Sequence, residues 1–268
     1  MEFLRAVLEI LDADMTTPVG YGWFHLLFFA LSIGMGIVLC LKLKNPTEKQ
    51  VRTVLLIVSV TSIVLEIYKQ INYTFSPTDT GINVDYQWYA FPWQFCSMPM
   101  YVGLLGGLTR GKFHDAMCAF LATYSTFAGL CVMLYPAQVF ISTIGINIQT
   151  MICHGSMLTV GIFLLGTQYV KSTHRTILKA IPVFSAAVLM AMGMNELAHW
   201  TDFAGGETFN MFFISPYEDP SLPVYSIVQQ YVPYPWCLII YIAAFSLAAY
   251  LILLISMGWM QLKKKAKK

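Results

Sequence analysis

Apolar residues in this chain occur in long runs that are separated by shorter polar segments. Seven of these runs are long enough to cross a bilayer, since a spanning helix needs about 20 mostly apolar residues. The runs are 20–41, 51–73, 92–109, 114–134, 148–170, 177–199 and 234–260. This pattern predicts an all-α, polytopic membrane protein with seven transmembrane helices.

The two ends of the chain differ from these runs. Residues 1–14 place their apolar side chains on one helical face, which predicts a short amphipathic helix lying in the membrane interface. Residues 261–268 form a basic tail. We therefore expect a single membrane domain over 1–268, with the helix bundle in 20–260.

The distribution of positive charge predicts the orientation of this bundle in the membrane. Of the 16 Lys and Arg residues, all but Arg5 and Lys69 fall in four short stretches, at 42–52, 110–112, 171–179 and 263–268. Cytoplasmic loops accumulate Lys and Arg, so these stretches predict an external N-terminus and a cytoplasmic C-terminus. With 57% hydrophobic residues, 11% charged residues and a net charge of +2, the composition suits a membrane protein and no nucleic-acid binder.

This topology brings the chemically interesting polar residues to one level, in the outer half of the membrane. Ionisable groups inside a membrane are costly and are functional hypotheses by default. Two outer segments, 74–91 and 200–233, are long enough to cover such a site. The polar residues at this level are His25, Glu66, Lys69, Cys96, His154, Asn195, Glu196 and His199.

Several of these residues also have a structural interpretation. Glu66 and Lys69 are three residues apart, so they share a helix face and can neutralise each other as an ion pair. His25 has apolar neighbours typical of a core histidine, and His199 stands beside Trp200 as an interfacial residue would. The sequence also leaves open whether a disulfide forms among the four cysteines of the outer half, which are Cys96, Cys131, Cys153 and Cys237.

Cys96 has the most reactive setting of the six cysteines. Pro92 suits the first turn of the third helix, and Cys96 then follows within about one turn, where unpaired N–H groups favour a thiolate. His154 lies at a similar depth and is followed by Gly155, which permits close helix approach. A thiol beside a neutral imidazole is the minimum arrangement for nucleophilic catalysis.

Over residues 20–260 the chain resembles the YwaF-like polytopic membrane proteins of bacteria. Relatives of that family include an animal transmembrane phospholipid acyltransferase and, more distantly, membrane hydrolases of fatty-acid esters. The resemblance is carried by His25, by Pro92 to Cys96, by His154 with Gly155, by Asn195, by Asn210 to Phe213 with Pro216, and by Pro235 with Trp236.

This resemblance implies that Cys96 is an acyl-accepting nucleophile and that His154 is its base, in a bacterial plasma membrane. Family members often carry a histidine two residues before the cysteine, where this chain has Gln94. Membrane phospholipids or other fatty-acyl lipids are the expected partners, and no cofactor or metal is expected. The oligomeric state stays open.

The sequence thus predicts a membrane acyltransferase or lipid-ester hydrolase. In this reading Asn195 or Gln94 helps to hold the oxyanion, and the supporting or substrate-binding residues are His25, Glu66, Lys69, Glu196, His199 and Asn210. The main rival is a lipid or small-molecule transporter or binding protein that uses the same polar residues as a pocket. A metal hydrolase built on His25, His154, His199 and Glu196 ranks last, because only Glu196 and His199 come from one helix.

Overall fold

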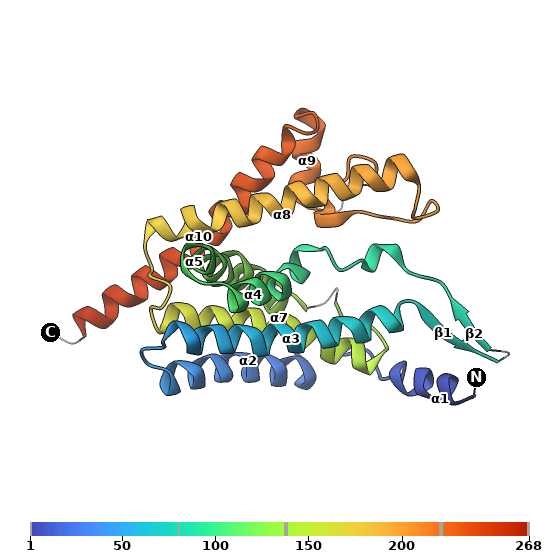
Figure 1. Ribbon diagram of the computed structural model, residues 1–268, viewed down its shortest axis with the longest axis horizontal. Helices are drawn as coiled ribbons and strands as arrows, with labels where there is room; N and C mark the ends of the chain where they lie inside the picture. Colours follow the sequence, from blue (N-terminus) through green and yellow to red (C-terminus); the bar gives the residue numbers. More distant parts are fainter. Residues whose placement is uncertain (1, 80, 137–138, 220–221, 267–268) are drawn as a thin grey trace.

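A computed structural model of the chain describes residues 2–79, 81–136, 139–219 and 222–266. Nearly all of its regular structure is helical. The helices are α1 (Glu2–Leu11), α2 (Trp23–Lys42), α3 (Glu48–Asn72), α4 (Met98–Leu108), α5 (Gly111–Phe120), α6 (Thr126–Leu134), α7 (Ile144–Gly166), α8 (His174–Thr201), α9 (Pro223–Tyr231) and α10 (Cys237–Lys265). A π-helical segment, Leu121–Ser125, joins α5 to α6, so that 111–134 runs as one helix (Figure 1).

Within the described ranges, six helices are long and apolar enough to cross a membrane. They are α2, α3, the joined helix 111–134, α7, α8 and α10, and they begin and end within a few residues of the predicted runs. The membrane protein class and six of the predicted spans are therefore confirmed.

The seventh predicted span, 92–109, is not a full-length helix. Only Phe95–Leu108 is helical there, as a short 3₁₀ turn (Phe95–Ser97) followed by α4. The 11 residues of α4 cover about 16 Å at 1.5 Å per residue, roughly half of a hydrocarbon core. Phe91 is extended, with φ −50° and ψ 134°, as expected for the residue before a proline, so Pro92 does not open the helix. Pro99 takes the helix-opening position instead.

The joined helix 111–134 and α7 form the centre of the bundle. On one side α7 packs against α2, and on the other against α6, while α3 packs against α4 and α7 and α5 packs against α8 (Figure 1). Small residues permit these approaches. A methyl group added at Gly129 of α6 would lie 2.7 Å from Cβ of Met157 and 2.8 Å from the backbone oxygen of His154.

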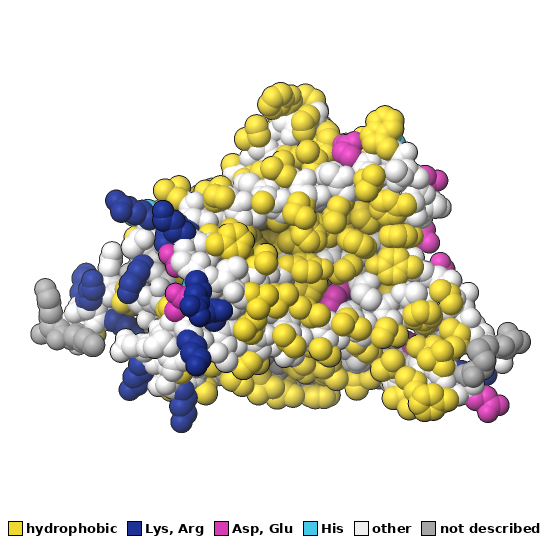
Figure 2. All heavy atoms as spheres, in the orientation of Figure 1, with side chains coloured by type: hydrophobic (Ala, Val, Ile, Leu, Met, Phe, Trp, Pro, Cys, Tyr) yellow, Lys and Arg dark blue, Asp and Glu magenta, His cyan; other side chains and the backbone are white. Residues whose placement is uncertain are grey.

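Charged side chains separate towards the two ends of the bundle. In Figure 2 the Lys and Arg side chains gather at the end where α10 finishes and where α2 connects to α3. Most Asp and Glu side chains on this face lie towards the opposite end, where α8 ends and where α1 and the β-hairpin lie. Lys263, Lys264 and Lys265 form the last turn of α10. The remaining predicted tail residues, Lys267 and Lys268, lie outside the described residues.

Both long segments at the less basic end contain structure that the sequence did not predict. The first, 74–91, holds an antiparallel hairpin of β1 (Phe75–Thr78) and β2 (Gly81–Val84) and a 3₁₀ turn at Trp88–Ala90. The second, 200–233, holds a 3₁₀ turn at Met211–Phe213 and the helix α9. The predicted N-terminal helix is present as α1, which packs against β1 and α3.

Candidate functional site

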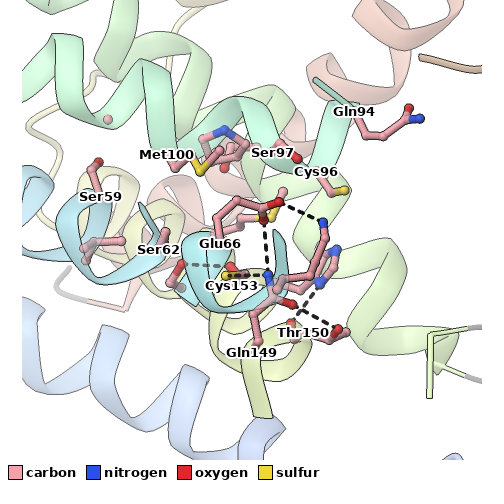
Figure 3. A pocket seen from close by; sticks show the side chains of 18 of the residues that line it. Ser59, Ser62, Glu66, Gln94, Cys96, Ser97, Met100, Gln149, Thr150 and Cys153 are labelled. Carbon is pink, nitrogen blue, oxygen red and sulfur yellow. Dashed lines mark hydrogen bonds and ion pairs between the residues drawn. The ribbon is translucent and has the colours of Figure 1, made fainter. Parts of the chain in front are cut away.

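A cavity of about 240 Å³ lies between α3, the start of α4, the π-helical segment and α7. Five of the predicted site residues line it, although they come from three separate parts of the chain: Glu66, Lys69, Gln94, Cys96 and His154. Figure 3 shows Glu66 and Cys96 near one another at this cavity, whereas the amide of Gln94 points away from Glu66. The structure therefore brings together the predicted thiol, the predicted imidazole and the ion pair of the second span.

Cys96 lies in the 3₁₀ turn directly before α4 and is exposed to the cavity. Its neighbours Ser97 and Met98 are buried, so Cys96 is the exposed residue of this part of the turn. The N–H groups of Ser97 and Met98 donate to the backbone oxygens of Gln94 and Phe95 within this turn, and Pro99 has no N–H, so the predicted unpaired donors at the start of the helix are largely absent. All six cysteines are free thiols, so no disulfide occupies Cys96, Cys131, Cys153 or Cys237.

His154 is half-buried on the cavity side of α7. Its Nδ1 lies 2.8 Å from the backbone oxygen of Thr150. A carbonyl oxygen only accepts, so Nδ1 must carry the proton, and the lone pair of the neutral ring is then on Nε2. In the described chain no hydrogen bond joins this ring to the Cys96 thiol, although both side chains line the same cavity.

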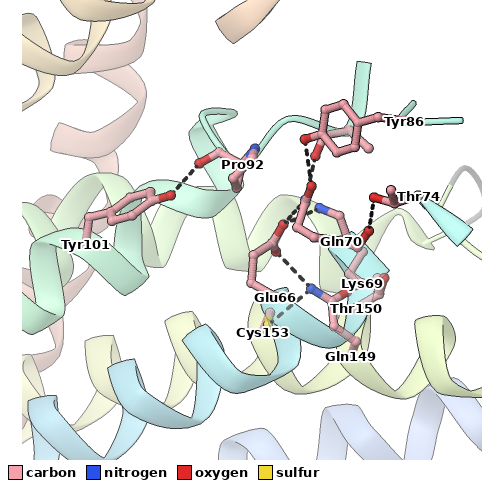
Figure 4. A network of polar contacts seen from close by, with 11 residues as sticks. Glu66, Lys69, Gln70, Thr74, Tyr86, Pro92, Tyr101, Gln149, Thr150 and Cys153 are labelled. Atoms are coloured by element: carbon pink, nitrogen blue, oxygen red, sulfur yellow. Dashed lines mark hydrogen bonds and ion pairs between the residues drawn. The ribbon is translucent and has the colours of Figure 1, made fainter. Parts of the chain in front are cut away.

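Glu66 is the most enclosed charge at the site, with 7% of its surface exposed. Its Oε1 accepts from Nζ of Lys69 at 2.9 Å and from Nε2 of Gln70 at 2.7 Å, and its Oε2 accepts from Nε2 of Gln149 at 3.3 Å (Figure 4). The predicted ion pair is thus present, and two amides extend it. Tyr86 completes the network by donating its hydroxyl to Oε1 of Gln70 at 2.7 Å.

Gln70 and Gln149 were not among the predicted site residues. Gln70 follows Glu66 by one helical turn, a spacing that the sequence did display. Gln149 is 83 residues from Glu66, and only the packing of α7 on α3 brings them together.

Gln94 fixes the second long loop to the cavity wall. Its Nε2 donates to the backbone oxygen of Asn210 at 3.0 Å, and its Oε1 accepts from the backbone N–H of Phe212 at 2.9 Å. The side chain of Asn210 turns away from the cavity and accepts from the backbone N–H of Ser215 at 3.0 Å. The Gln94 amide is thus directed at the loop backbone.

Asn195, Glu196 and His199 lie on α8, away from this cavity, and hold the same loop from its other side. The amide of Asn195 pairs with both backbone groups of Met211, at 2.8 and 3.1 Å. Glu196 accepts from the Tyr217 hydroxyl at 2.7 Å, and this hydrogen bond raises the pKa of Tyr217. The ring of His199 stacks on Tyr217 with centroids 3.5 Å apart.

His25 is fully buried outside the cavity lining. Its Nδ1 accepts from the backbone N–H of Tyr21 at 3.1 Å, and its Nε2 donates to the backbone oxygen of Met133 at 3.0 Å. Both ring nitrogens are therefore occupied. Across the described ranges, no three His, Cys, Asp or Glu side chains are grouped so that they could hold a metal ion.

Six helices of spanning length, three of which contribute residues to the cavity, define a multi-pass membrane protein. The family model named TMEM164 family matches residues 20–255, most of the chain. The chain belongs to the TMEM164 family. No curated protein and no solved structure matches it. The relationship to YwaF-like proteins and to acyltransferases stays a prediction.

Proposed function

We propose that the protein is an integral membrane acyltransferase or lipid-ester hydrolase with Cys96 as its nucleophile. The observation that carries this proposal is the exposed Cys96 thiol in a cavity that His154 also lines. A nucleophilic thiol needs access to its substrate and a base at hand.

The cavity has the polarity that a lipid ester requires. Glu66 and Lys69 lie in the last third of α3, towards the less basic end of the bundle. Leu55 and Val58 line the cavity from the first half of α3, nearer the basic end. Leu121 and Val160 extend the apolar part. A polar headgroup beside Lys69 and an acyl chain against the leucines and valines would place an ester between them, near Cys96.

The reaction follows from this placement. Sγ of Cys96 attacks the ester carbonyl while its proton passes to Nε2 of His154. The ester C–O bond breaks, and the leaving lipid oxygen takes the proton from His154. A second lipid hydroxyl, or water, then attacks the thioester and restores the Cys96 thiol.

Intact mass spectrometry after incubation with mixed phospholipids tests the nucleophile. Wild-type protein is expected to gain an acyl-sized mass that hydroxylamine removes, whereas Cys96→Ala gains none and loses about 10³-fold or more in turnover. Cys153→Ala is the matched control, because Cys153 is a second free thiol lining the same cavity. An adduct that survives Cys96→Ala would refute the assignment.

A lipid-binding or transport function is the second candidate. Three donors hold the Glu66 carboxylate, and a thiol mechanism has no evident use for that carboxylate. In addition, no hydrogen bond joins Cys96 to His154 in the described residues. Both observations favour binding or transport. Unmodified lipid recovered equally from wild type and Cys96→Ala, without any adduct, would support this candidate.

The proposed location is a bacterial plasma membrane, with the N-terminus outside and the basic end of the bundle in the cytoplasm. The resemblance to YwaF-like proteins supports the membrane, and the gathering of Lys and Arg side chains at one end supports the orientation (Figure 2).

A further inference from the structure

A second hollow, of about 480 Å³, lies between α3 and α4, and we call it the α3–α4 groove. On α3 it is lined by Ile63, Ile67 and Ile71, and on α4 by Tyr101 and Leu104. Ile67 is 55% exposed, so the groove lies open on the surface of the bundle. The lining is apolar except for Glu66, Gln70, Thr74 and the hydroxyl of Tyr101.

The groove exists because α4 is short. Helix α3 has 25 residues and α4 has 11, so the outer part of α3 has no full helical partner on this side. The irregular chain around Pro92 lies there instead and leaves a hollow. Figure 2 shows an apolar surface over the middle of the molecule where α3 and α4 lie.

The α3–α4 groove and the Cys96 cavity share part of their walls. Glu66 and Met100 line both of them. Glu66 is held in place by its three donors, whereas Met100 is an unbranched side chain that repacks easily. Movement of the Met100 side chain would open the groove to the cavity.

The polar groups of the groove indicate what binds there. Nε2 of Gln70 donates to Glu66 and to the backbone oxygen of Ala90, the Thr74 hydroxyl donates to the backbone oxygen of Gln70, and the Tyr101 hydroxyl donates to that of Pro92. These donors are already engaged within the protein, so the groove offers an incoming group mainly apolar surface. Hydrocarbon is the chemistry that fits.

We propose that the α3–α4 groove binds an acyl chain of a bilayer lipid and is the lateral route by which that chain reaches the Cys96 cavity, past Met100. The proposal extends the proposed function by naming the entry of its substrate, but it does not require that Cys96 perform acyl transfer. It concerns only the route by which a membrane-dissolved molecule reaches the thiol.

The test is the rate at which Cys96 is alkylated in protein-containing vesicles of phosphatidylcholine. One reagent is a maleimide with a long alkyl chain, which dissolves in the bilayer, and the other is a small water-soluble maleimide. Modification is followed on the Cys96 peptide by mass spectrometry. Ile67→Trp fills the groove, and Val64→Trp is its control, since Val64 is 59% exposed on the same helix but does not line the groove.

We expect Ile67→Trp to slow the long-chain maleimide by about tenfold or more and to leave the water-soluble reagent unchanged. Val64→Trp should change neither rate. Leu104→Trp fills the groove from α4 and replaces Ile67→Trp in the test if that variant does not fold. Its control is Leu108→Trp, because Leu108 is exposed on α4 and does not line the groove.

Three results would overturn the proposal. The long-chain reagent could react with Ile67→Trp and Leu104→Trp at the wild-type rate, or the control variants could slow it equally. Alternatively, Ile67→Trp could dissociate an oligomer, which would make the groove an interface with a second copy. If alkylation behaves as expected but no acyl adduct forms on Cys96, the lipid route stands and the proposed acyl transfer fails.

Discussion

The pair of Glu66 and Lys69 shows how a charge is maintained inside the bundle. A charged group within a membrane segment is costly and persists where it is paired and hydrogen-bonded. Glu66 has a cation, Lys69, and two amides, Gln70 and Gln149, as donors. Its removal would leave the ammonium group of Lys69 in the bundle without a carboxylate.

We therefore expect Glu66→Ala to lower the free energy of unfolding by about 3–5 kcal/mol, the usual cost of breaking a buried pair from one side. The double variant Glu66→Gln with Lys69→Met removes both charges and should lie much closer to the wild type. Thermal unfolding in a mild detergent measures both effects. A Glu66→Ala variant as stable as the double variant would show that the pair contributes no such energy.

The sequence was sufficient for the local part of this site but not for its long-range part. The ion pair of Glu66 and Lys69 followed from a spacing of three residues. The Gln94 side chain hydrogen-bonds to the backbone of Asn210 and Phe212, which are 116 and 118 positions away. No local sequence pattern reveals contacts over such distances. The engagement of both His25 nitrogens likewise depends on Met133, 108 positions away.

Among the elements, the joined helix 111–134 departs most from regular geometry. Its π-helical segment contributes Leu121 and Ser125 to the cavity, and the Thr126 hydroxyl donates to the backbone oxygen of Leu121 at 2.9 Å. Ser125 is fully buried, and its hydroxyl has no hydrogen-bond partner among the described residues. Such single π-turns occur frequently at functional sites.

Close contact between α6 and α7 supports this region and can be tested at Gly129. Gly129→Ala would push a methyl group against the backbone of His154, so we expect it to destabilise the protein by about 1–3 kcal/mol and to lower the activity that depends on His154. Gly34→Ala on α2 is the control, because a methyl group there meets nothing within 4 Å. Equal thermal stability of the two variants would contradict the close packing.

The apolar runs were enough to predict the long helices, but α4, the hairpin and α9 needed tertiary information. The run 92–109 is apolar throughout much of its length, yet its first residues are held by Gln94 and by the extended Phe91. The strands β1 and β2 and the helix α9 are regular structure that no long apolar run in the sequence indicates.

On the scale of the whole molecule, the separation of charge gives a testable orientation. Lys44 lies in the basic α2–α3 connection, and Tyr231 ends α9 on the opposite side; both are exposed. In intact cells, we expect a membrane-impermeant maleimide to label Tyr231→Cys and to spare Lys44→Cys until the membrane is permeabilised. Mass spectrometry of the two labelled peptides measures which end of the bundle faces outwards. The reverse labelling pattern would show that the proposed orientation is wrong.

The shortness of α4 also affects the surrounding bilayer. A membrane next to a hydrophobic segment shorter than its own core becomes locally thinner, at a modest energetic cost. Leu105 and Leu108 of α4 are exposed, so we expect the bilayer beside this short helix to be thinner than around the long helices. For the proposed route through the α3–α4 groove, we expect thin membranes to favour lipid entry at this side of the bundle and thick membranes to oppose it.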